Sequence, residues 1–321
     1  MTRLALIHPT HLLAQELRES LDRRRELWLD LQLLSDDPEE IGHLTEARGA
    51  AAMVQPLDGH SLDGIDVVFF GGSLEKTRPL LDRLPASATA ILLAPETEPS
   101  LGRPLVAGVN LELASRGEIL ISPHPGAVAL SHLLHPLRGF GPRRATATLL
   151  QPVSVFGNEA LDEVLNQTRA ILAFADNPPK EIFSTQLTFN TLPTASETPS
   201  VVTDHLHAVL GEDLAVEVQT LQMGIFHSFG ISLFVELSGN PDLAEVEEAL
   251  AAHPMIDRAV DPELLGPIDA AAREELILGS VTQVPGTPGV FRIWAVMDNL
   301  TCGGALNALH ILEALGLQIT H

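Results

Sequence analysis

Short apolar runs alternate with helical patterns through the first 122 residues, and this alternation constrains the fold more than any other feature. The runs of strand length occupy residues 4–7, 28–34, 66–70, 88–93 and 118–122. Between them, Leu13, Leu17 and Leu21 recur at helical spacing, and residues 74–84 show the same periodicity. Strands that alternate with helices are typical of a parallel sheet with helices on its faces. We therefore predict an α/β domain built on a mostly parallel sheet.

The pattern changes after residue 126. Alternating apolar and polar residues predict long strands over residues 145–155, 214–223, 231–237 and 290–297, with a short strand near 186–190 in an otherwise loop-like stretch, 177–200. Apolar residues at helical spacing predict helices over residues 127–134, 202–210, 243–252 and 305–315. A further helix is predicted to bury one face, formed by Leu161, Val164, Leu165, Thr168, Ile171 and Leu172. Long strands with interspersed helices predict an α+β second domain.

Composition excludes several classes of function. The chain has 321 residues and a formal charge of −23, so a phosphate backbone or an anionic membrane surface would be repelled. No apolar run approaches the length of about 20 residues that a membrane helix needs. A single cysteine excludes an internal disulfide, and no signal peptide is visible. We expect two domains, a cytoplasmic location, and neither nucleic acid nor membrane as a partner.

The first strand-to-helix turn lacks the glycines of a dinucleotide site. It reads His8-Pro9-Thr10-His11, continuing to residue 14 without a glycine. Large side chains at His8 and His11 would occupy the phosphate position. An ordinary connection with Thr10 as helix N-cap is the favoured interpretation over a nucleotide site of unusual shape. Asp36 and Asp37 follow the next strand. In NAD folds an acid at this place binds ribose hydroxyls, and two acids would repel the phosphate of NADP. A solvated turn is the favoured interpretation of these two residues.

Neither the cysteine nor the histidines form a convincing site. Cys302 lies at a predicted helix start, where the dipole would lower the pKa of its thiol. A lone cysteine is more often a small buried residue, and no partner base is evident. His132 and His135 share a helix face at i+3, but no carboxylate lies nearby. The chain has no zinc-enzyme signature, and we predict no metal site.

Several short segments are informative as a set. They lie at residues 69–73, 104–110, 151–157 with 161–163, and 294–308. Their order and spacing resemble the aspartate-semialdehyde dehydrogenase family over essentially the whole chain. The resemblance implies a discontinuous Rossmann-like domain of the NAD(P)-binding type, 1–126 and 303–321, in which the last helix returns to the first domain. It also implies an α+β dimerisation domain of the semialdehyde dehydrogenase type, 127–302, and a homodimer.

The chain departs from this family at the positions that carry the chemistry. In active members a cysteine thiolate attacks the aldehyde, a hydride passes to NADP, and phosphate releases the acyl group. The match places Pro125 at the nucleophile and Phe229 at the acid/base histidine. Ile231 falls where a substrate-binding glutamate is expected, and Glu98 falls near a phosphate-binding arginine. His227 lies two residues from the base position, about 6–7 Å along a strand, which is too far to replace it.

Other family positions are retained. Gln151 and Asn299 remain from the former substrate pocket, and Gly71 and Gly72 remain from the former cofactor site. Neither amide can carry out the reaction alone. With the glycine fingerprint also lost, we expect no catalytic residue, no metal and no bound cofactor, including the NADP of active relatives. The chain resembles in particular the Usg-type paralogues that lack the catalytic cysteine.

Two hypotheses follow for function. The first is a catalytically inactive protein of this family that acts as a homodimeric interaction or structural protein, with its own copy or with an unidentified protein partner. The alternative is an enzyme or small-ligand binder that reuses the old cleft, or a protein with residual semialdehyde dehydrogenase activity. Clustered titratable groups with shifted pKa values would favour the alternative.

Overall fold

The computed structural model describes residues 2–24, 26–27, 29–175, 177–193 and 197–317. The chain divides into two compact units. Unit 1 consists of Met1–His124 together with Gly304–His321, and unit 2 consists of Pro125–Gly303. Unit 1 is therefore discontinuous in sequence, because the last segment of the chain belongs to it. No helix in the described part of the chain is long and apolar enough to cross a membrane.

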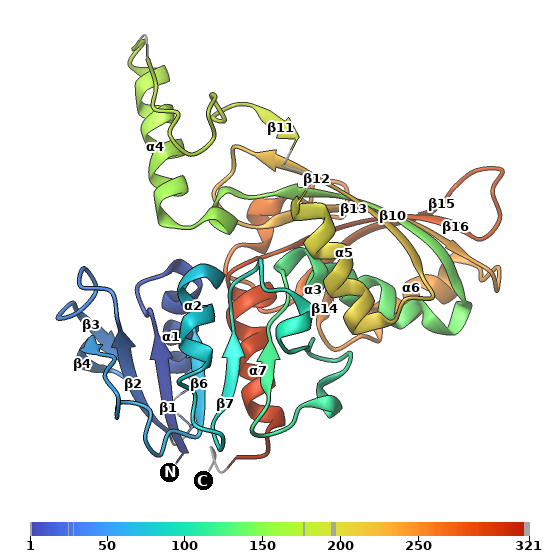
Figure 1. Ribbon diagram of the computed structural model, residues 1–321. Coiled ribbons are helices and arrows are strands. Elements are labelled where there is room, and N and C mark those ends of the chain that lie inside the picture. The colour runs from blue at the N-terminus through green and yellow to red at the C-terminus, as the bar shows by residue number, and fades with distance from the viewer. Residues whose placement is uncertain (1, 25, 28, 176, 194–196, 318–321) are drawn as a thin grey trace. The chain divides into compact units, whose positions relative to one another are not determined.

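Unit 1 contains a seven-stranded sheet in which every neighbouring pair is parallel (Figure 1). The strand order is β5-β2-β1-β6-β7-β9-β8. The bounds are β1 Thr2–Ile7, β2 Leu29–Ser35, β5 Gln55–Pro56, β6 Val67–Phe70, β7 Thr89–Leu92, β8 Arg103–Pro104 and β9 Ile119–Ile121. The central strands are buried on both faces, as parallel strands under helices must be. The predicted parallel sheet is confirmed.

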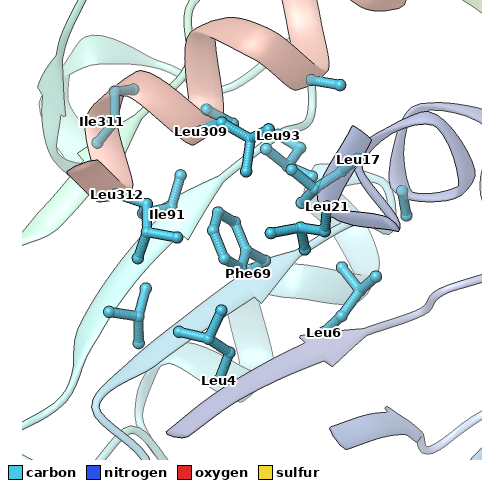
Figure 2. Close-up of a cluster of buried hydrophobic side chains, with 14 of the residues drawn as sticks. Leu4, Leu6, Leu17, Leu21, Phe69, Ile91, Leu93, Leu309, Ile311 and Leu312 are labelled. Atoms are coloured by element: carbon cyan, nitrogen blue, oxygen red, sulfur yellow. The ribbon is translucent and has the colours of Figure 1, made fainter. Parts of the chain in front are cut away.

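Helices and core side chains cover both faces of this sheet. The helices are α1 Leu12–Arg23, α2 Leu74–Leu81 and α7 Asn307–Ala314. On one face, Leu17 of α1 and Leu309 of α7 pack with Phe69 of β6 (Figure 2). On the other face, Leu80 of α2 packs with Phe70. The last helix of the chain thus completes the core of unit 1.

Unit 1 differs from the prediction at several places, among them the short edge strands β5 and β8, which we did not predict. A hairpin of β3 Leu44–Ala47 and β4 Ala50–Met53 lies where we predicted no strand. Its residues are mostly exposed, so they carry no apolar alternation. The helix predicted to residue 84 ends at Leu81. Short 3-10 helices, Pro99–Leu101 and Leu111–Leu113, also went unpredicted.

Unit 2 contains a mixed seven-stranded sheet with the order β11-β12-β10-β13-β16-β15-β14. The strands are β10 Pro142–Gln151, β11 Thr191–Pro193, β12 Ala215–Met223, β13 Phe229–Leu237, β14 Ile256–Arg258, β15 Leu276–Gln283 and β16 Val290–Met297. The pairs β10–β12 and β14–β15 are parallel, and the other pairs are antiparallel. The helices are α3 Pro125–Leu134, α4 Asn158–Leu172, α5 Glu197–Leu210 and α6 Leu243–Ala251. Mixed strands with interspersed helices match the predicted α+β organisation.

One face of this sheet is buried and the other is open. Helix α5 contacts β12 and α3, and α6 contacts β14 and β15. Along β10, Ala145 and Ala147 are buried whereas Thr146 is exposed. Thr146 lies opposite Phe234 of β13, which lies opposite Arg292 of β16. All three of these side chains are exposed, and we call the side of the sheet that they mark the open face.

Helix α4 buries a face that only partly overlaps the predicted one, with Val164 common to both. Ala160, Glu163, Val164 and Gln167 are buried, whereas two of the predicted face residues, Leu165 and Leu172, are exposed. The cause is hydrogen bonding to the following loop. Glu163 accepts from the backbone N–H of Ile182 at 2.6 Å, and Gln167 accepts from that of Leu187 at 2.8 Å. Polar side chains therefore face the protein here, which an apolar pattern cannot reveal.

Other corrections in unit 2 concern strand ends. The strand predicted over 145–155 starts at Pro142 and ends at Gln151, and Val153–Phe156 forms a 3-10 helix. The strand predicted near 186–190 is not formed, and β11 follows it at Thr191–Pro193. We did not predict β14, β15 or the 3-10 helices His135–Phe140 and Pro267–Ala270.

Candidate functional site

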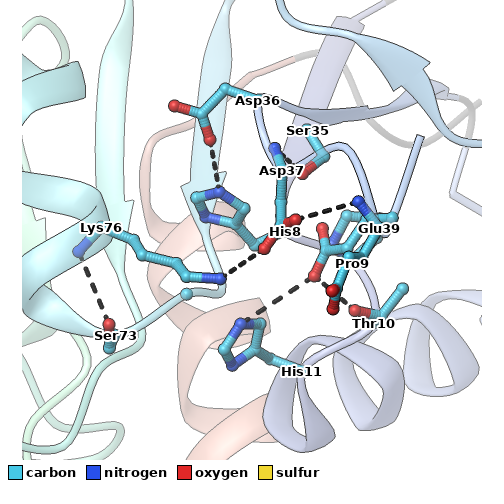
Figure 3. A network of polar contacts seen from close by, with 12 residues as sticks. His8, Pro9, Thr10, His11, Ser35, Asp36, Asp37, Glu39, Ser73 and Lys76 are labelled. Atoms are coloured by element: carbon cyan, nitrogen blue, oxygen red, sulfur yellow. Dashed lines mark hydrogen bonds and ion pairs between the residues drawn. The ribbon is translucent and has the colours of Figure 1, made fainter.

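The turn after β1 keeps a glycine-like backbone but carries a buried histidine. His8 has φ +54°, in the left-handed region that favours glycine. Its side chain is fully buried, and its Nε2 lies 2.8 Å from Asp36 Oδ1 (Figure 3). A Cβ on Gly72 would clash with His8 Nδ1, and one on Gly71 would lie 2.5 Å from Ala14 Cβ. Gly72 thus allows the ring to lie against the chain just beyond β6, whereas Gly71 allows Ala14 of α1 to approach closely.

Charged side chains complete the network around this turn (Figure 3). Lys76 Nζ donates to Asp37 Oδ2 at 2.7 Å. This hydrogen bond lowers the pKa of the Asp37 carboxyl and raises the pKa of Lys76. The Thr10 hydroxyl donates to Glu40, whose carboxylate also lies 3.9 Å from His11 Nε2. Burial lowers the pKa of His11, against the opposing effect of Glu40.

The predicted N-cap role of Thr10 is wrong. The N-cap of α1 is His11, and no side chain caps the helix. Thr10 instead uses its hydroxyl on Glu40, one position before the cap. Asp36 lies in an exposed bend that leads into the turn 38–40, as the favoured interpretation of a solvated turn predicted. Asp36 also pairs with His8, and Asp37 pairs with Lys76 of α2.

Three features of these residues bear on the fit of NADP. The space beside Gly72, at the carboxyl ends of β1 and β6, is filled by the His8 ring. Asp36 and Asp37 place two carboxyl groups at the end of β2, where a 2′-phosphate would be repelled. No residue of the turn is a glycine whose backbone a pyrophosphate could approach.

In unit 2, Pro125 is the first residue of α3 and is buried. Proline is favoured at a first helical position because its missing N–H has no helical partner there. The π-helical turn Thr301–Leu306 approaches it closely: a Cβ on Gly303 would lie 2.9 Å from Pro125 Cβ. The position is therefore closely packed and carries no nucleophilic atom.

Phe229 opens β13 and is fully buried, opposite Met297 of β16. The preceding residue, Ser228, is buried with φ +73°, and its N–H donates to Asn299 Oδ1 at 3.0 Å. His227 is exposed and its ring lies near that of Phe226, at 6.5 Å between centroids. The imidazole of His227 thus lies outside the buried cluster that contains Phe229.

The two retained amides are buried among neutral partners. Gln151 Nε2 donates to Gln222 Oε1 at 3.2 Å, and Gln222 Nε2 donates to the Gln151 carbonyl at 3.2 Å. Asn299 Nδ2 donates to Ser154 Oγ at 3.0 Å. Within the described residues, Gln151 Oε1 and Ser228 Oγ have no hydrogen-bond partner. The site presents amides and hydroxyls, none of which titrates near neutral pH.

Sequence reasoning missed three members of this cluster: Gln222, Ser154 and Ser228. Gln222 lies opposite Gln151 in the parallel pairing of β10 and β12, a register that the sequence does not reveal. Ser228 stands at a left-handed position, which only the backbone reveals. Two other expected positions lie elsewhere: Ile231 is in the buried face of β13, and Glu98 is exposed and pairs with Arg78 at 3.1 Å.

Cys302 is a small buried residue, as the favoured interpretation predicted: it lies within the π-helical turn and is 1% exposed. The alternative, a thiol pKa lowered by a helix dipole, is wrong, because burial raises the pKa of this thiol. His132 and His135 gather around His253, with ring centroids 5.1 and 6.3 Å from it. No group of three or more histidine, cysteine, aspartate or glutamate residues in the described ranges is placed to hold a metal ion.

Comparison with known proteins identifies the family. Residues 134–302, more than half of the chain, match the family described as semialdehyde dehydrogenase, dimerisation domain. The USG-1 protein homolog of Pseudomonas aeruginosa is 27% identical over 97% of this chain and 97% of its own. The aspartate-semialdehyde dehydrogenase of Synechocystis is 26% identical over 98% of this chain and 97% of its own. A solved structure, a probable aspartate-semialdehyde dehydrogenase from Pseudomonas aeruginosa, has a TM-score of 0.90 at 26% identity and covers 98% of both chains. This chain belongs to the semialdehyde dehydrogenase family.

Proposed function

We propose that this chain is a catalytically inactive relative of aspartate-semialdehyde dehydrogenase that acts as a homodimeric interaction or structural protein. Pro125 is the observation that carries the proposal. It occupies the position at which the family resemblance expects the cysteine nucleophile, and it is buried at the start of α3. Without a thiolate, no covalent adduct with an aldehyde forms, so there is no state from which a hydride leaves.

The neighbouring side chains do not supply the missing chemistry. Phe229, at the position expected for the base, neither accepts nor donates a proton. Gln151 and Asn299 are neutral amides that are already engaged with Gln222, Ser154 and Ser228. General acid–base help is typically worth about 10²–10⁴-fold in rate. The acid/base group is therefore missing as well as the nucleophile.

The open face of the unit 2 sheet supports the homodimer. It displays Phe234 and Arg292 as cross-strand neighbours on long strands. A sheet face that no helix covers is available to pack against the same face of a second copy. The matched family is described as a dimerisation domain, and it includes all of β10, β13 and β16. A cytoplasmic location and an unidentified further protein partner are part of the same proposal.

One observation favours the alternative of a small-ligand binder. Gln151 Oε1 and Ser228 Oγ are buried without a partner among the described residues, and such atoms are usually satisfied by water or ligand. A neutral amide would complement both atoms. Thermal unfolding with acetamide or propionamide tests this: a saturable rise in Tm that Gln151→Leu abolishes would support the ligand binder.

The proposed loss of activity is tested by restoring the missing cysteine and histidine side chains. We expect Pro125→Cys to stay inactive, and Pro125→Cys with Phe229→His to stay inactive as well, since residues that act as a unit are strongly non-additive. The readout is absorbance of reduced cofactor with aspartate semialdehyde, phosphate and NADP. Turnover by the single variant would show that the rest of the site is intact and would contradict the proposal.

A further inference from the structure

The end of β1 is the topological switch point of unit 1. The chain passes from β1 to β2 on one side and later returns to β6 on the other side. In open parallel sheets, ligands bind in the crevice outside the carboxyl ends of the strands at this point. His8 follows β1, Asp36 lies just beyond β2, and Gly72 lies just beyond β6. All three therefore surround the position at which such a sheet takes its ligand.

His8 is held at this point against two local preferences. Its backbone is left-handed, which is uncommon for a residue with a side chain. Its ring is fully buried, and Nδ1 has no hydrogen-bond partner within the described residues. Only Nε2 is satisfied, by Asp36 at 2.8 Å. A histidine elsewhere in the turn would avoid both penalties, so the position of this ring calls for a reason.

We propose that the His8 imidazole is an internal ligand of the switch-point crevice, and that removing it uncovers a site for an adenine dinucleotide. The ring lies against Gly72, at the carboxyl ends of β1 and β6 where such a sheet takes its ligand. It also engages Asp36, the carboxylate that would otherwise face a ribose. This inference rests on the proposed function, because it explains why the turn takes no cofactor.

The structure favours an unphosphorylated dinucleotide over its 2′-phosphate form. Asp36 suits ribose hydroxyls and repels a further phosphate. The nearby ammonium of Lys76 is already engaged by Asp37 at 2.7 Å. The backbone at residue 8 already has the conformation of glycine. A glycine at this position therefore fits without rearrangement of β1 or α1 and leaves a void of the size of the imidazole.

The experiment compares His8→Gly with His11→Gly. Both variants add one glycine to the same turn, but His11→Gly keeps the His8 ring. Calorimetric titration with NAD should show binding by His8→Gly at least about tenfold tighter than by the unmodified protein or His11→Gly. 4-Methylimidazole, which has the ring of the histidine side chain, should raise the Tm of His8→Gly alone and compete with NAD. NADP should bind more weakly than NAD.

A second variant tests the same inference in case His8→Gly does not fold. His8→Asn tolerates the left-handed backbone but lacks the ring, and its shorter amide does not reach Asp36 in place of Nε2. It should show intermediate NAD binding. If either variant is folded by circular dichroism yet gains neither NAD binding nor stabilisation by 4-methylimidazole, the internal-ligand inference is wrong while the proposed function stands. If the unmodified protein binds NAD as tightly as His8→Gly, the inference and the proposed loss of cofactor binding both fail.

Discussion

Cys302 shows how strongly the surroundings of a single residue decide its chemistry. The thiol is enclosed in the π-helical turn Thr301–Leu306, and Asp298 lies close enough to disfavour a second negative charge. Both effects raise the pKa of the thiol, with burial the larger. The neutral form therefore persists well above neutral pH, and the thiolate that would react is scarce.

We predict that Cys302 of the native protein resists thiol reagents between about pH 7 and pH 9. The raised pKa means that this increase in pH adds almost no thiolate to the folded state, whereas an exposed thiol would react much faster at the higher pH. Labelling with a chromogenic disulfide, followed by absorbance, should proceed only in denaturant. Complete labelling of folded protein within minutes at neutral pH would contradict this.

At the residue scale, the sequence identifies substitutions but not the contacts that replace them. The proline at 125 and the absence of glycine from residues 8–14 are legible from residue type alone. The pairing of His8 with Asp36 is not, because it joins residues 28 positions apart whose side chains meet only when β1 and β2 pair. The left-handed backbone of Ser228 cannot be predicted from residue type either, because serine has no preference for this conformation.

At the element scale, α7 is the clearest case of a helix whose stability comes from distant packing. Leu309 is fully buried, in the same cluster as Leu17 and Phe69. We predict that Leu309→Ala lowers the free energy of unfolding by about 2–5 kcal/mol, since it leaves a cavity in the core. The matched control, Leu113→Ala, alters a residue that is 47% exposed and should change it by less than about 0.5 kcal/mol.

Urea unfolding monitored by circular dichroism measures both leucine variants. Leu17, Phe69 and Leu309 all belong to unit 1. The loss of stability in Leu309→Ala should therefore appear in the unfolding transition of that unit. Equal stability of the two variants would mean that α7 does not complete this core.

Helix α4 fixes the loop that follows it through Gln167. The amide donates to the carbonyls of Pro179 at 2.9 Å and Thr185 at 3.1 Å, and accepts from two backbone N–H groups. We predict that Gln167→Ala destabilises the loop by about 1–3 kcal/mol, because these groups lose their partner. Trypsin cleavage after Lys180 should then become faster. Asn166→Ala, at the exposed neighbouring position, should leave the cleavage rate unchanged, and equal rates in both variants would refute the role of Gln167.

Apolar periodicity predicts the helices and strands whose apolar residues face the core. It fails for elements in which polar side chains face the protein. The strands β1, β6, β10 and β13 follow their patterns closely, apart from their ends. The face of α4 was misassigned because Glu163 and Gln167 are buried through hydrogen bonds. The exposed hairpin of β3 and β4 offers no alternation to detect.

At the scale of the whole molecule, the open face must overcome a formal charge of −23 on each copy. Such a charge keeps protein copies apart unless a surface compensates. We predict a two-fold homodimer that buries more than about 2,000 Å² in total. Phe234→Glu should shift light scattering toward the 34.4 kDa monomer, because it places a charge amid the open face.

Val260→Glu is the matched control for this substitution. Val260 is fully exposed and lies outside the strands, so the same change there should leave the dimer intact. A 34.4 kDa particle over a wide concentration range for the unmodified protein would refute the dimer. A dimer that persists in Phe234→Glu would place the interface elsewhere.

Loss of catalysis is the central claim, and a direct turnover assay tests it. Purified protein is incubated with aspartate semialdehyde, phosphate and NADP, and the absorbance of reduced cofactor is followed beside an active dehydrogenase as the positive control. Protein carrying Pro125→Ala, prepared in the same way, reveals any contaminating host enzyme. We predict that the unmodified protein gives no signal above the background without enzyme. Turnover that exceeds this background and persists after contaminating enzyme is removed would contradict the account.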